Sequence, residues 1–263
     1  MSDPISDAPL VMLETVQSPR GNVANLTINN PAKANCLGGA TMRAFIDKAA
    51  ALRDDFELRA VVVTGAGNRA FVGGADVREM AVLDQDEARR FITLVHQTCA
   101  AVRALPVPVI ARINGAALGA GLELAAACDF RIAAAHARFG MPEVRLGMPS
   151  VVEAALLPQL IGWGRTRRLL LTGEVIDSAA AARWGLVEEV VPDDDLDDAV
   201  ARALDGILSA GSRAVRLQKR LIQEWETQSI PAAVHAGIEC YADAWTSDEP
   251  RRMMAAFLRS RRR

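Results

Sequence analysis

The stretch that decides the fold is Ile113–Asp129, with the sequence INGAALGAGLELAAACD. It continues an apolar, β-branched run, and its small residues Gly119, Ala120 and Gly121 open an apolar helical pattern. The first turn of a helix has unpaired N–H donors and the positive end of the helix dipole, and small residues let a substrate oxygen approach those donors closely. The stretch therefore predicts a strand, a turn and a helix start that can stabilise a developing negative charge.

Glu123 lies near the start of this otherwise apolar helix. Burial among apolar residues would raise the pKa of its carboxyl group toward the range useful for proton transfer. A simpler interpretation is an acidic residue in the first turn, where the helix dipole favours it. This segment alone supports the two interpretations equally.

On both sides of this stretch, short apolar runs rich in β-branched residues alternate with longer helical patterns, which is typical of α/β architecture. The predicted strands are Val11–Val16, Val23–Ile28, Ala60–Thr64, Val109–Ile113 and Phe130–Ala133. The predicted helices are Thr41–Arg53, Glu87–Ala104 and Gly119–Cys128. We expect this half of the chain to form repeated strand–helix units.

After Pro149 the strand signals almost vanish, and the Ala- and Arg-rich sequence predicts a helical C-terminal region. Arg213–Trp225 has the spacing of an amphipathic helix. Farther on, Thr246 and Glu249 fit a capping box with Pro250 in the first helical turn. The last helix has an apolar face, and we expect it to dock on its own core or on a neighbouring subunit.

Composition places the chain among folded globular proteins and argues against several kinds of partner. Its 263 residues are 51% hydrophobic and 24% charged, unlike those of a disordered chain. The net charge of -2 gives no long-range field that would attract nucleic acid or an anionic membrane surface. No apolar stretch reaches the ~20 residues of a membrane span. The polar, acidic residues Met1–Pro9 do not resemble a secretion signal.

The cysteines and histidines form none of the common catalytic or metal-binding motifs. The cysteines are far apart, with neither a C-x-x-C pair nor a zinc-ligand cluster, and are predicted to be reduced thiols in a cytoplasmic protein. No serine stands in a G-x-S-x-G elbow, and no histidine begins an H-E-x-x-H helix. The cysteines are Cys36, Cys99, Cys128 and Cys240, and the histidines are His96, His136 and His235.

The strand and Gly-rich turn over Val61–Asp76 begin like the cofactor loop of a short-chain dehydrogenase. A dinucleotide fingerprint needs a third glycine where Arg69 or Ala70 stands, and it should open a helix directly. The single tyrosine, Tyr241, is followed four residues later by Trp245, so no Tyr-x-x-x-Lys pair exists. A nicotinamide enzyme is therefore strongly disfavoured.

Glu143 follows a proline in a segment between apolar residues, where most glutamates are solvated loop residues. Its significance comes from the other segments, because together they resemble the crotonase (enoyl-CoA hydratase/isomerase) superfamily in the right order over nearly the whole chain. The matching segments are Phe71–Asp76, Asn114–Glu123, Phe139–Glu143, Asn29–Leu37, Leu171–Glu174, Trp184–Val187 and Ala256–Arg259.

The resemblance implies an α/β fold of the ClpP/crotonase-like kind. In this fold, repeated β-β-α units form a spiral, followed by a helical C-terminal region. It implies a crotonase core over residues 1–195 and a helical trimerisation region over residues 196–263. Members of the family are usually homotrimers or dimers of trimers, so we expect the same here.

By the same resemblance, the backbone N–H groups of Ala75 and Ala120 form an oxyanion hole for the thioester carbonyl, and Glu123 and Glu143 carry the protons. The implied substrate is an acyl-CoA, with coenzyme A as part of the substrate and no metal or redox cofactor. Lys33 and Arg259 are candidates for contacts to the phosphates. The residues implied in coenzyme A binding are Lys33, Ala34, Asn35, Cys36, Gly73, Gly74, Ala75, Asp76, Gly119 and Ala120.

Because both glutamates are present, the resemblance favours hydration of a trans-2-enoyl-CoA to the 3-hydroxyacyl-CoA. The alternatives are a Δ3-Δ2-enoyl-CoA isomerase or another crotonase-type acyl-CoA lyase, and a less favoured one is a non-enzymatic CoA- or RNA-binding scaffold. One departure is Pro149–Leu157, where similar hydratases often have a Gly-rich segment. It adds a third carboxylate, Glu153, which we interpret as solvated rather than as an extra acid or base.

Overall fold

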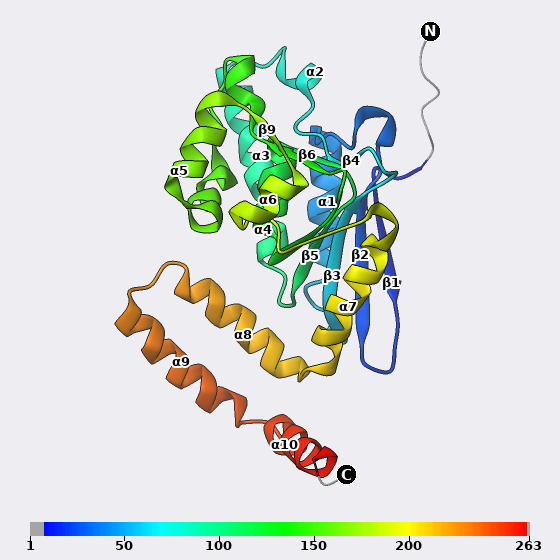
Figure 1. Cartoon of the computed structure of the whole chain (residues 1–263), viewed down its shortest axis with the longest axis vertical. Coiled ribbons are helices and arrows are strands. Elements are labelled where there is room, and N and C mark those ends of the chain that lie inside the picture. The colour runs from blue at the N-terminus through cyan, green and yellow to red at the C-terminus, as the bar shows by residue number, and fades with distance from the viewer. Residues whose placement is uncertain (1–7, 262–263) are drawn as a thin grey trace.

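The computed structural model describes residues 8–261, so the interpretation of Met1–Asp7 lies outside the described residues. Within this range the strands form a six-stranded sheet in the order β1-β2-β3-β5-β7-β10 and a four-stranded sheet in the order β4-β6-β8-β9. Helices cover the sheets, and three further helices extend away from the body (Figure 1). No helix of this part of the chain is long and apolar enough to span a membrane.

The bounds of the elements are as follows. The strands are β1 (Val11–Val16), β2 (Asn22–Ile28), β3 (Leu58–Gly65), β4 (Ala70–Val72), β5 (Val109–Ile113), β6 (Ala116–Leu118), β7 (Phe130–Ala134), β8 (Arg138–Gly140), β9 (Val175–Asp177) and β10 (Glu189–Val191). The α-helices are α1 (Gly39–Ala51), α2 (Val77–Met80), α3 (Gln85–Arg103), α4 (Ala120–Ala127), α5 (Leu157–Thr172), α6 (Ser178–Trp184), α7 (Leu196–Ser209), α8 (Ser212–Trp225), α9 (Ile230–Ala244) and α10 (Glu249–Ser260). The 3₁₀ helices are η1 (Pro31–Lys33), η2 (Pro142–Leu146), η3 (Val152–Leu156) and η4 (Asp193–Asp195).

Successive pairs of strands build a spiral. In β3–β4, β5–β6 and β7–β8, the first strand joins the six-stranded sheet and the second joins the four-stranded sheet. Neighbouring turns of the spiral pair in parallel, as the partners Val62 with Ile110 and Ala117 with Phe139 show. A helix follows each of the first two pairs, α4 after β5–β6 directly. The predicted α/β spiral of β-β-α units is confirmed.

The core has two parts that follow the alternation of side chains along the strands. Val61 and Val63 of β3 point into the main core, which α1, α3 and α4 cover. Val62 between them points to the opposite face, into a smaller cluster that α7 covers. Burial on both faces explains why this central strand is a continuous apolar run.

The long predicted elements agree with the structure, and the short strands were missed. The predicted strands and helices of the first half end within two residues of the observed ones. β4, β6, β8, β9 and β10 have three residues each, too few for a recognisable alternation. Two of them, β9 and β10, lie after Pro149, so the prediction of an almost purely helical second half was wrong there.

The last three helices, α8–α10, form an extended segment that we call the C-terminal arm (Figure 1). One buried cation attaches it to the body: Lys219 Nζ donates to Val107 O and Asp129 Oδ2, both at 2.8 Å. The amphipathic helix predicted over Arg213–Trp225 is therefore confirmed as α8, with an internal lysine that the pattern did not distinguish from its surface cations.

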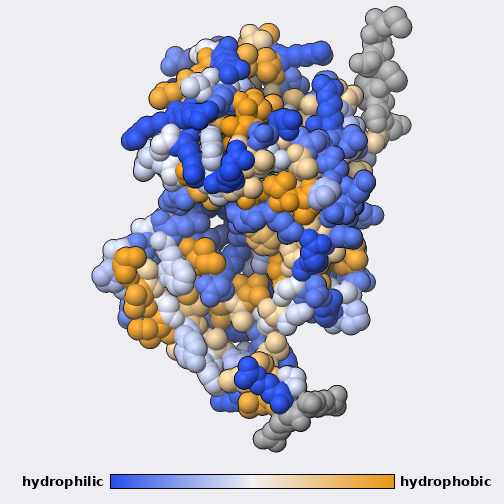
Figure 2. Space-filling model, viewed as in Figure 1, coloured by the Kyte–Doolittle hydropathy of each residue, from blue (hydrophilic) through white to orange (hydrophobic). Residues whose placement is uncertain are grey.

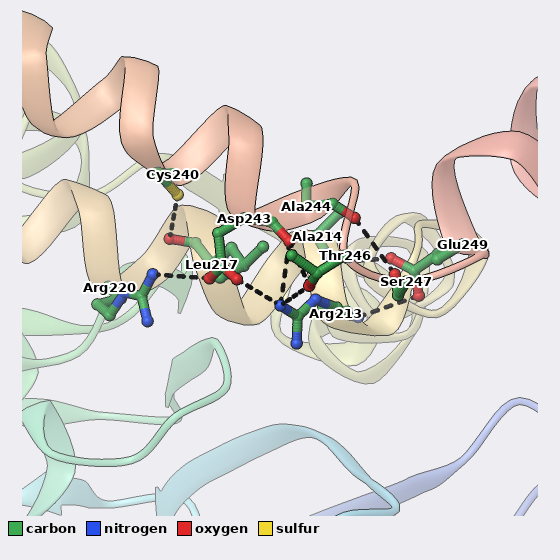
Figure 3. Close-up of polar contacts among 10 residues, drawn as sticks. All are labelled: Arg213, Ala214, Leu217, Arg220, Cys240, Asp243, Ala244, Thr246, Ser247 and Glu249. Carbon is green, nitrogen blue, oxygen red and sulfur yellow. Dashed lines mark hydrogen bonds and ion pairs between the residues drawn. The ribbon is translucent and has the colours of Figure 1, made fainter.

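The capping box predicted at the start of α10 is wrong. Glu249 Oε2 accepts from Arg213 N–H at 3.1 Å, and Glu249 Oε1 accepts from Ala214 N–H at 2.9 Å (Figure 3). The Thr246 hydroxyl donates to Asp243 O at 2.8 Å instead of capping α10. The pattern correctly predicted that Glu249 caps a helix N-terminus, but it assigned the wrong helix. The Glu249 carboxylate caps α8 and not its own helix, α10.

We predict that Gly121→Ala destabilises the fold by about 1–3 kcal/mol, because the added Cβ overpacks the start of α4. A Cβ there would lie 2.1 Å from Val72 O on β4. Gly206→Ala is the control, since a Cβ at this position inside α7 meets nothing within 4 Å. It should stabilise by roughly 0.5–1 kcal/mol. Urea unfolding of both variants measures this, and equal midpoints would contradict the close contact.

Candidate active site

A cavity of about 600 Å³ lies between the loop after β4, the start of α4 and the segment around Glu143–Val151. This volume is typical of a small-molecule site. Four of the predicted site residues meet in its wall: Ala75, Ala120, Glu123 and Glu143. The rest of the wall is mostly apolar and comes largely from α2, α3 and the segments next to them, with Met80, Leu83, Phe91, Ile92, Val95 and Met148.

Two residues of this wall, Ala75 and Ala120, have backbone N–H groups that local hydrogen bonding leaves available. The backbone of Leu37 holds the loop on both sides of Ala75. Leu37 N–H donates to Gly74 O at 2.8 Å, and Leu37 O accepts from Asp76 N–H at 3.0 Å, so these bonds do not use the N–H of Ala75. Ala120 is the first residue of α4, so its N–H has no partner within the helix. The arrangement places two available donors in the wall of one cavity.

Glu123 is buried in the first turn of α4 and is 4% exposed. Its Oε1 accepts a hydrogen bond from Ala154 N–H at 3.2 Å. Burial, then the charge of Glu143 and finally that of Glu153, raises the pKa of the Glu123 carboxyl group from 4.5 to about 8, against the lowering effect of Ala154 N–H. Its protonated and ionised forms are therefore both populated near pH 8, which suits a group that passes protons.

Glu143 belongs to η2 and lines the cavity beside the start of α4. The Ser150 hydroxyl donates to Glu143 Oε2 at 2.7 Å and orients the carboxylate. The other oxygen lies against Gly119, where a Cβ would be 2.3 Å from Glu143 Oε1. Gly119 also has φ +50°, so the turn before α4 requires glycine both for its backbone and for the space it leaves to Glu143.

Most of the residues predicted to bind coenzyme A lie in two adjacent loops beside the cavity, and Gly119 and Ala120 lie at the start of α4. Ala34 and Asn35 have left-handed backbone conformations, and Gly73 N–H donates to Ala34 O at 2.8 Å. The Asn35 side chain is fully buried and donates to Ala66 O and Ala70 O. This amide ties the loops together, and Asn35 N–H donates to Asn30 O at 2.8 Å, so both the side chain and the N–H of Asn35 already have partners in the protein.

Other members of this set have local partners of their own. Lys33 is exposed, and Asp76 accepts from Arg78 N–H at the start of α2. Burial, and then the charge of Asp76, raises the pKa of the Cys36 thiol, which Lys33 lowers. Arg259 lies on α10 in the C-terminal arm, away from the cavity of its own chain (Figure 1). Within the described residues, Ala75 and Ala120 are the members of the set that line the cavity.

Glu153 is buried, so its interpretation as a solvated residue is wrong. It is 7% exposed, and its Oε1 lies 2.7 Å from His96 Nδ1. The reason is tertiary: η3, which carries Glu153, packs against both α3 and α4. The side chain turns inward toward α3 instead of outward to solvent.

Sequence reasoning also missed the apolar wall and Ser150. Phe91, Ile92 and Val95 lie on one face of α3, and their spacing could have identified an apolar face but not what it lines. Nothing in the sequence marks Ser150 as the partner of Glu143. Over residues 8–261, no group of three or more His, Cys, Asp and Glu side chains is arranged to hold a metal ion.

Comparisons with known proteins agree on one family. Residues 19–263 match the family model described as Enoyl-CoA hydratase/isomerase. The chain is 39% identical to a crotonyl-CoA hydratase of Syntrophomonas wolfei, over 91% of this chain and 93% of that protein. It is 35% identical to a short-chain-enoyl-CoA hydratase of Clostridium acetobutylicum, over 92% and 93%. The solved structure of an enoyl-CoA hydratase from Bacillus anthracis matches with a TM-score of 0.90 and 32% identity, over 95% of this chain and 96% of that one.

We predict that Glu123→Gln stabilises the protein at alkaline pH. A carboxyl group with a folded-state pKa of about 8 and an unfolded value of 4.5 contributes stability that is fully present below pH 4.5 and is lost as pH rises through 8. Glutamine does not ionise, so the variant avoids that loss, which is of the order of a few kcal/mol at about 1.4 kcal/mol per pKa unit. Melting temperatures of both proteins from pH 5 to 9 measure it. Parallel curves would show that Glu123 titrates normally.

Proposed function

We propose that this chain, which belongs to the enoyl-CoA hydratase/isomerase family, hydrates the trans-2 double bond of an enoyl-CoA to give the 3-hydroxyacyl-CoA. The observation that carries the proposal is that Glu123 and Glu143 line one cavity, close enough for the charge of Glu143 to act on Glu123, with Ala75 and Ala120 in the same wall. Hydration needs a base for water and an acid for the α-carbon, and this pair of carboxylates can supply both.

The N–H groups of Ala75 and Ala120 would bind the thioester carbonyl oxygen. Attack of water at the β-carbon pushes an electron pair through the conjugated system onto this oxygen, so negative charge develops there. Fixed donors stabilise that charge without reorganising, and removal of one such donor typically costs about 2.7–4 kcal/mol of transition-state stabilisation. Because both donors belong to the backbone, side-chain exchange at these positions leaves the chemistry intact.

Glu123, in its ionised form, would take a proton from the attacking water as the C–O bond forms at the β-carbon. The pair would share one proton, which Glu143, held by Ser150, delivers to the α-carbon as the enolate collapses. The proton that Glu123 takes from water replaces it, so the pair ends with the one proton with which it began. The raised pKa of Glu123, about 8, makes it a stronger base than an ordinary carboxylate. Burial limits access of further water, which favours addition of one positioned molecule.

The remaining cavity wall supports an aliphatic acyl group. Met80, Leu83 and Phe91 offer apolar contacts to a hydrocarbon chain. Coenzyme A is part of the substrate, and we propose that Lys33, the backbone around Ala34 and the neighbouring loop at Gly73 contact it. The hydrogen bond from Gly73 N–H to Ala34 O joins these two loops, and the second leads into Ala75 in the cavity wall. No step of this mechanism calls on a metal ion or a redox cofactor.

We also propose that residues 196–263 form the region through which the chain assembles into a homotrimer or a dimer of trimers. The C-terminal arm exposes many large apolar side chains, which gather along α9 and near α10 (Figure 2). Monomeric proteins rarely leave so continuous an apolar surface uncovered. The residues are Ile230, Val234, Ile238, Tyr241, Trp245, Met253, Met254, Phe257 and Leu258.

The free thiols of all four cysteines support a reducing compartment, which we take to be the cytoplasm.

Hydration of crotonyl-CoA tests the function directly, through loss of absorbance of the conjugated thioester. We expect wild type to hydrate it, and Glu123→Gln and Glu143→Gln each to lower kcat by about 10²–10⁴-fold, since each removes a proton-transfer group. Glu189→Gln is the matched control, because this carboxylate pairs with Arg202 on the surface. It should keep full activity.

The same assay separates the hydratase from the isomerase. If wild type leaves crotonyl-CoA unchanged but converts a 3-enoyl-CoA to the 2-enoyl isomer, or if Glu143 alone matters, the isomerase is correct and Glu123 is a structural residue. Lack of turnover with any acyl-CoA would favour a binding scaffold.

For assembly, we predict that Phe257→Asp dissociates the oligomer to monomers, because it places a charge in the apolar face of α10. Leu171→Asp is the control, on an exposed position of α5 outside the C-terminal arm. Sedimentation velocity of both variants and wild type gives the stoichiometry. A Phe257→Asp protein with the sedimentation coefficient of wild type would exclude α10 from the interface.

A further inference from the structure

Glu153 is a buried carboxylate that the mechanism above does not use. Its side chain is 8% exposed, its Oε1 contacts the half-exposed ring of His96 at 2.7 Å, and among the described residues its buried Oε2 has no hydrogen-bond partner. A carboxylate so placed loses most of its hydration, which is unfavourable unless something offsets it. Its position therefore calls for an explanation.

The turn that carries Glu153 is strained. Val152 has φ +39°, a left-handed conformation that β-branched residues rarely adopt. Strain of this kind persists where the surrounding structure imposes it and is often found at functional sites. Here it lies between Val151, which lines the cavity, and Glu153, which points to α3.

The next residue, Ala154, connects this turn to the catalytic cavity. Its N–H donates to Glu123 Oε1 at 3.2 Å and also to Val151 O at 2.9 Å. This is the hydrogen bond that the structure gives to the Glu123 carboxylate. The orientation of Glu123 thus depends on how the Val152–Ala154 turn is held, and the contact of Glu153 with His96 on α3 holds it.

The charged and titratable groups around Glu123 come from three elements besides its own. Glu143 faces it from η2 and Glu153 from η3, and the charges of both raise the pKa of Glu123. From α3, the buried Cys99 thiol lies beside the carboxylates, and burial, then Glu153 and then Glu123 raise its pKa. Also on α3 are His96, in contact with Glu153, and Arg89, which lines the cavity and pairs with Asp86.

We propose that Glu153 is a positioning residue for Glu123: anchored by His96, it fixes the strained turn whose Ala154 N–H orients the Glu123 carboxylate, and it adds a second negative charge beside that carboxylate. The proposal rests on the proposed function, in which Glu123 is the base. Glu153 does not line the cavity and is not offered as a group that touches substrate.

Two substitutions separate the anchor from the charge. Glu153→Gln removes the charge and keeps an oxygen that accepts from His96, so kcat should stay within about threefold while the acidic limb of the kcat/KM profile moves to lower pH by roughly 0.5–1 unit. The direction follows because the charge of Glu153 raises the pKa of Glu123, so its removal lowers that pKa. Glu153→Ala also removes the anchor, so kcat should fall about 10–100-fold, as expected for a misplaced catalytic group, with little change in KM.

The matched control is again Glu189→Gln, which removes one surface carboxylate and should leave the pH profile unmoved. His96→Gln keeps a donor to Glu153 and should resemble wild type in kcat. A purely structural Glu153 would change the melting temperature without moving the acidic limb. If Glu153→Ala fails to fold, Glu153→Gln alone decides.

A titration that needs no turnover keeps this inference distinct from the proposed function. With ¹³C-labelled glutamate carboxyls, the resonance lost in Glu123→Gln identifies Glu123, and its titration midpoint should be lower in Glu153→Gln than in wild type. Equal midpoints overturn the positioning proposal even in an active hydratase. A shifted midpoint in a protein that hydrates no enoyl-CoA supports the coupling and overturns the function.

Discussion

The close contact between the start of α4 and β4 is the constraint on which the rest of the site depends. Gly121 approaches Val72 O so closely that a Cβ would lie 2.1 Å away, and Gly119 leaves the space that the Glu143 carboxylate occupies. The two glycines bring a helix N-terminus against a sheet and against η2 at once. The N–H of Ala120 and the carboxyl group of Glu123 take their positions from this contact, so both are placed by backbone packing and not by adjustable side chains.

The parts of the fold that sequence could predict are those in which the local pattern and the tertiary environment agree. β3 is buried on both faces and therefore has a continuous apolar run, and α3 has both an apolar face and an N-terminal Asp84–Glu87 capping box. β4 and β6 have no such signal. They are three residues long and owe their existence to pairing with each other in the spiral, as Ala70 with Ala116 shows. Neither strand was predicted from its residues, and the resemblance to a family implied only that β-β-α units repeat.

The predictions that failed did so where a side chain serves a distant element. Glu249 fits a cap for its own helix, yet it caps α8, because the fold of the C-terminal arm brings Arg213 N–H and Ala214 N–H within reach. Glutamate is usually a surface residue, yet Glu153 is buried because η3 packs against both α3 and α4. A local sequence pattern indicates which kind of contact a side chain can make, whereas tertiary packing determines which partner it contacts.

The Val152–Ala154 turn has two features that destabilise the folded protein, a strained backbone and a buried carboxylate. A left-handed β-branched residue such as Val152 costs about 1–3 kcal/mol. Burial, and then the charges of Glu143 and Glu153, raise the pKa of the Glu123 carboxyl group to about 8. The packing of the surrounding core imposes this turn and offsets its cost, so the unfavourable conformation is maintained beside the Glu123 carboxyl group. Strain, charge and a backbone donor in three successive residues, Val152, Glu153 and Ala154, therefore act on one group, the Glu123 carboxyl.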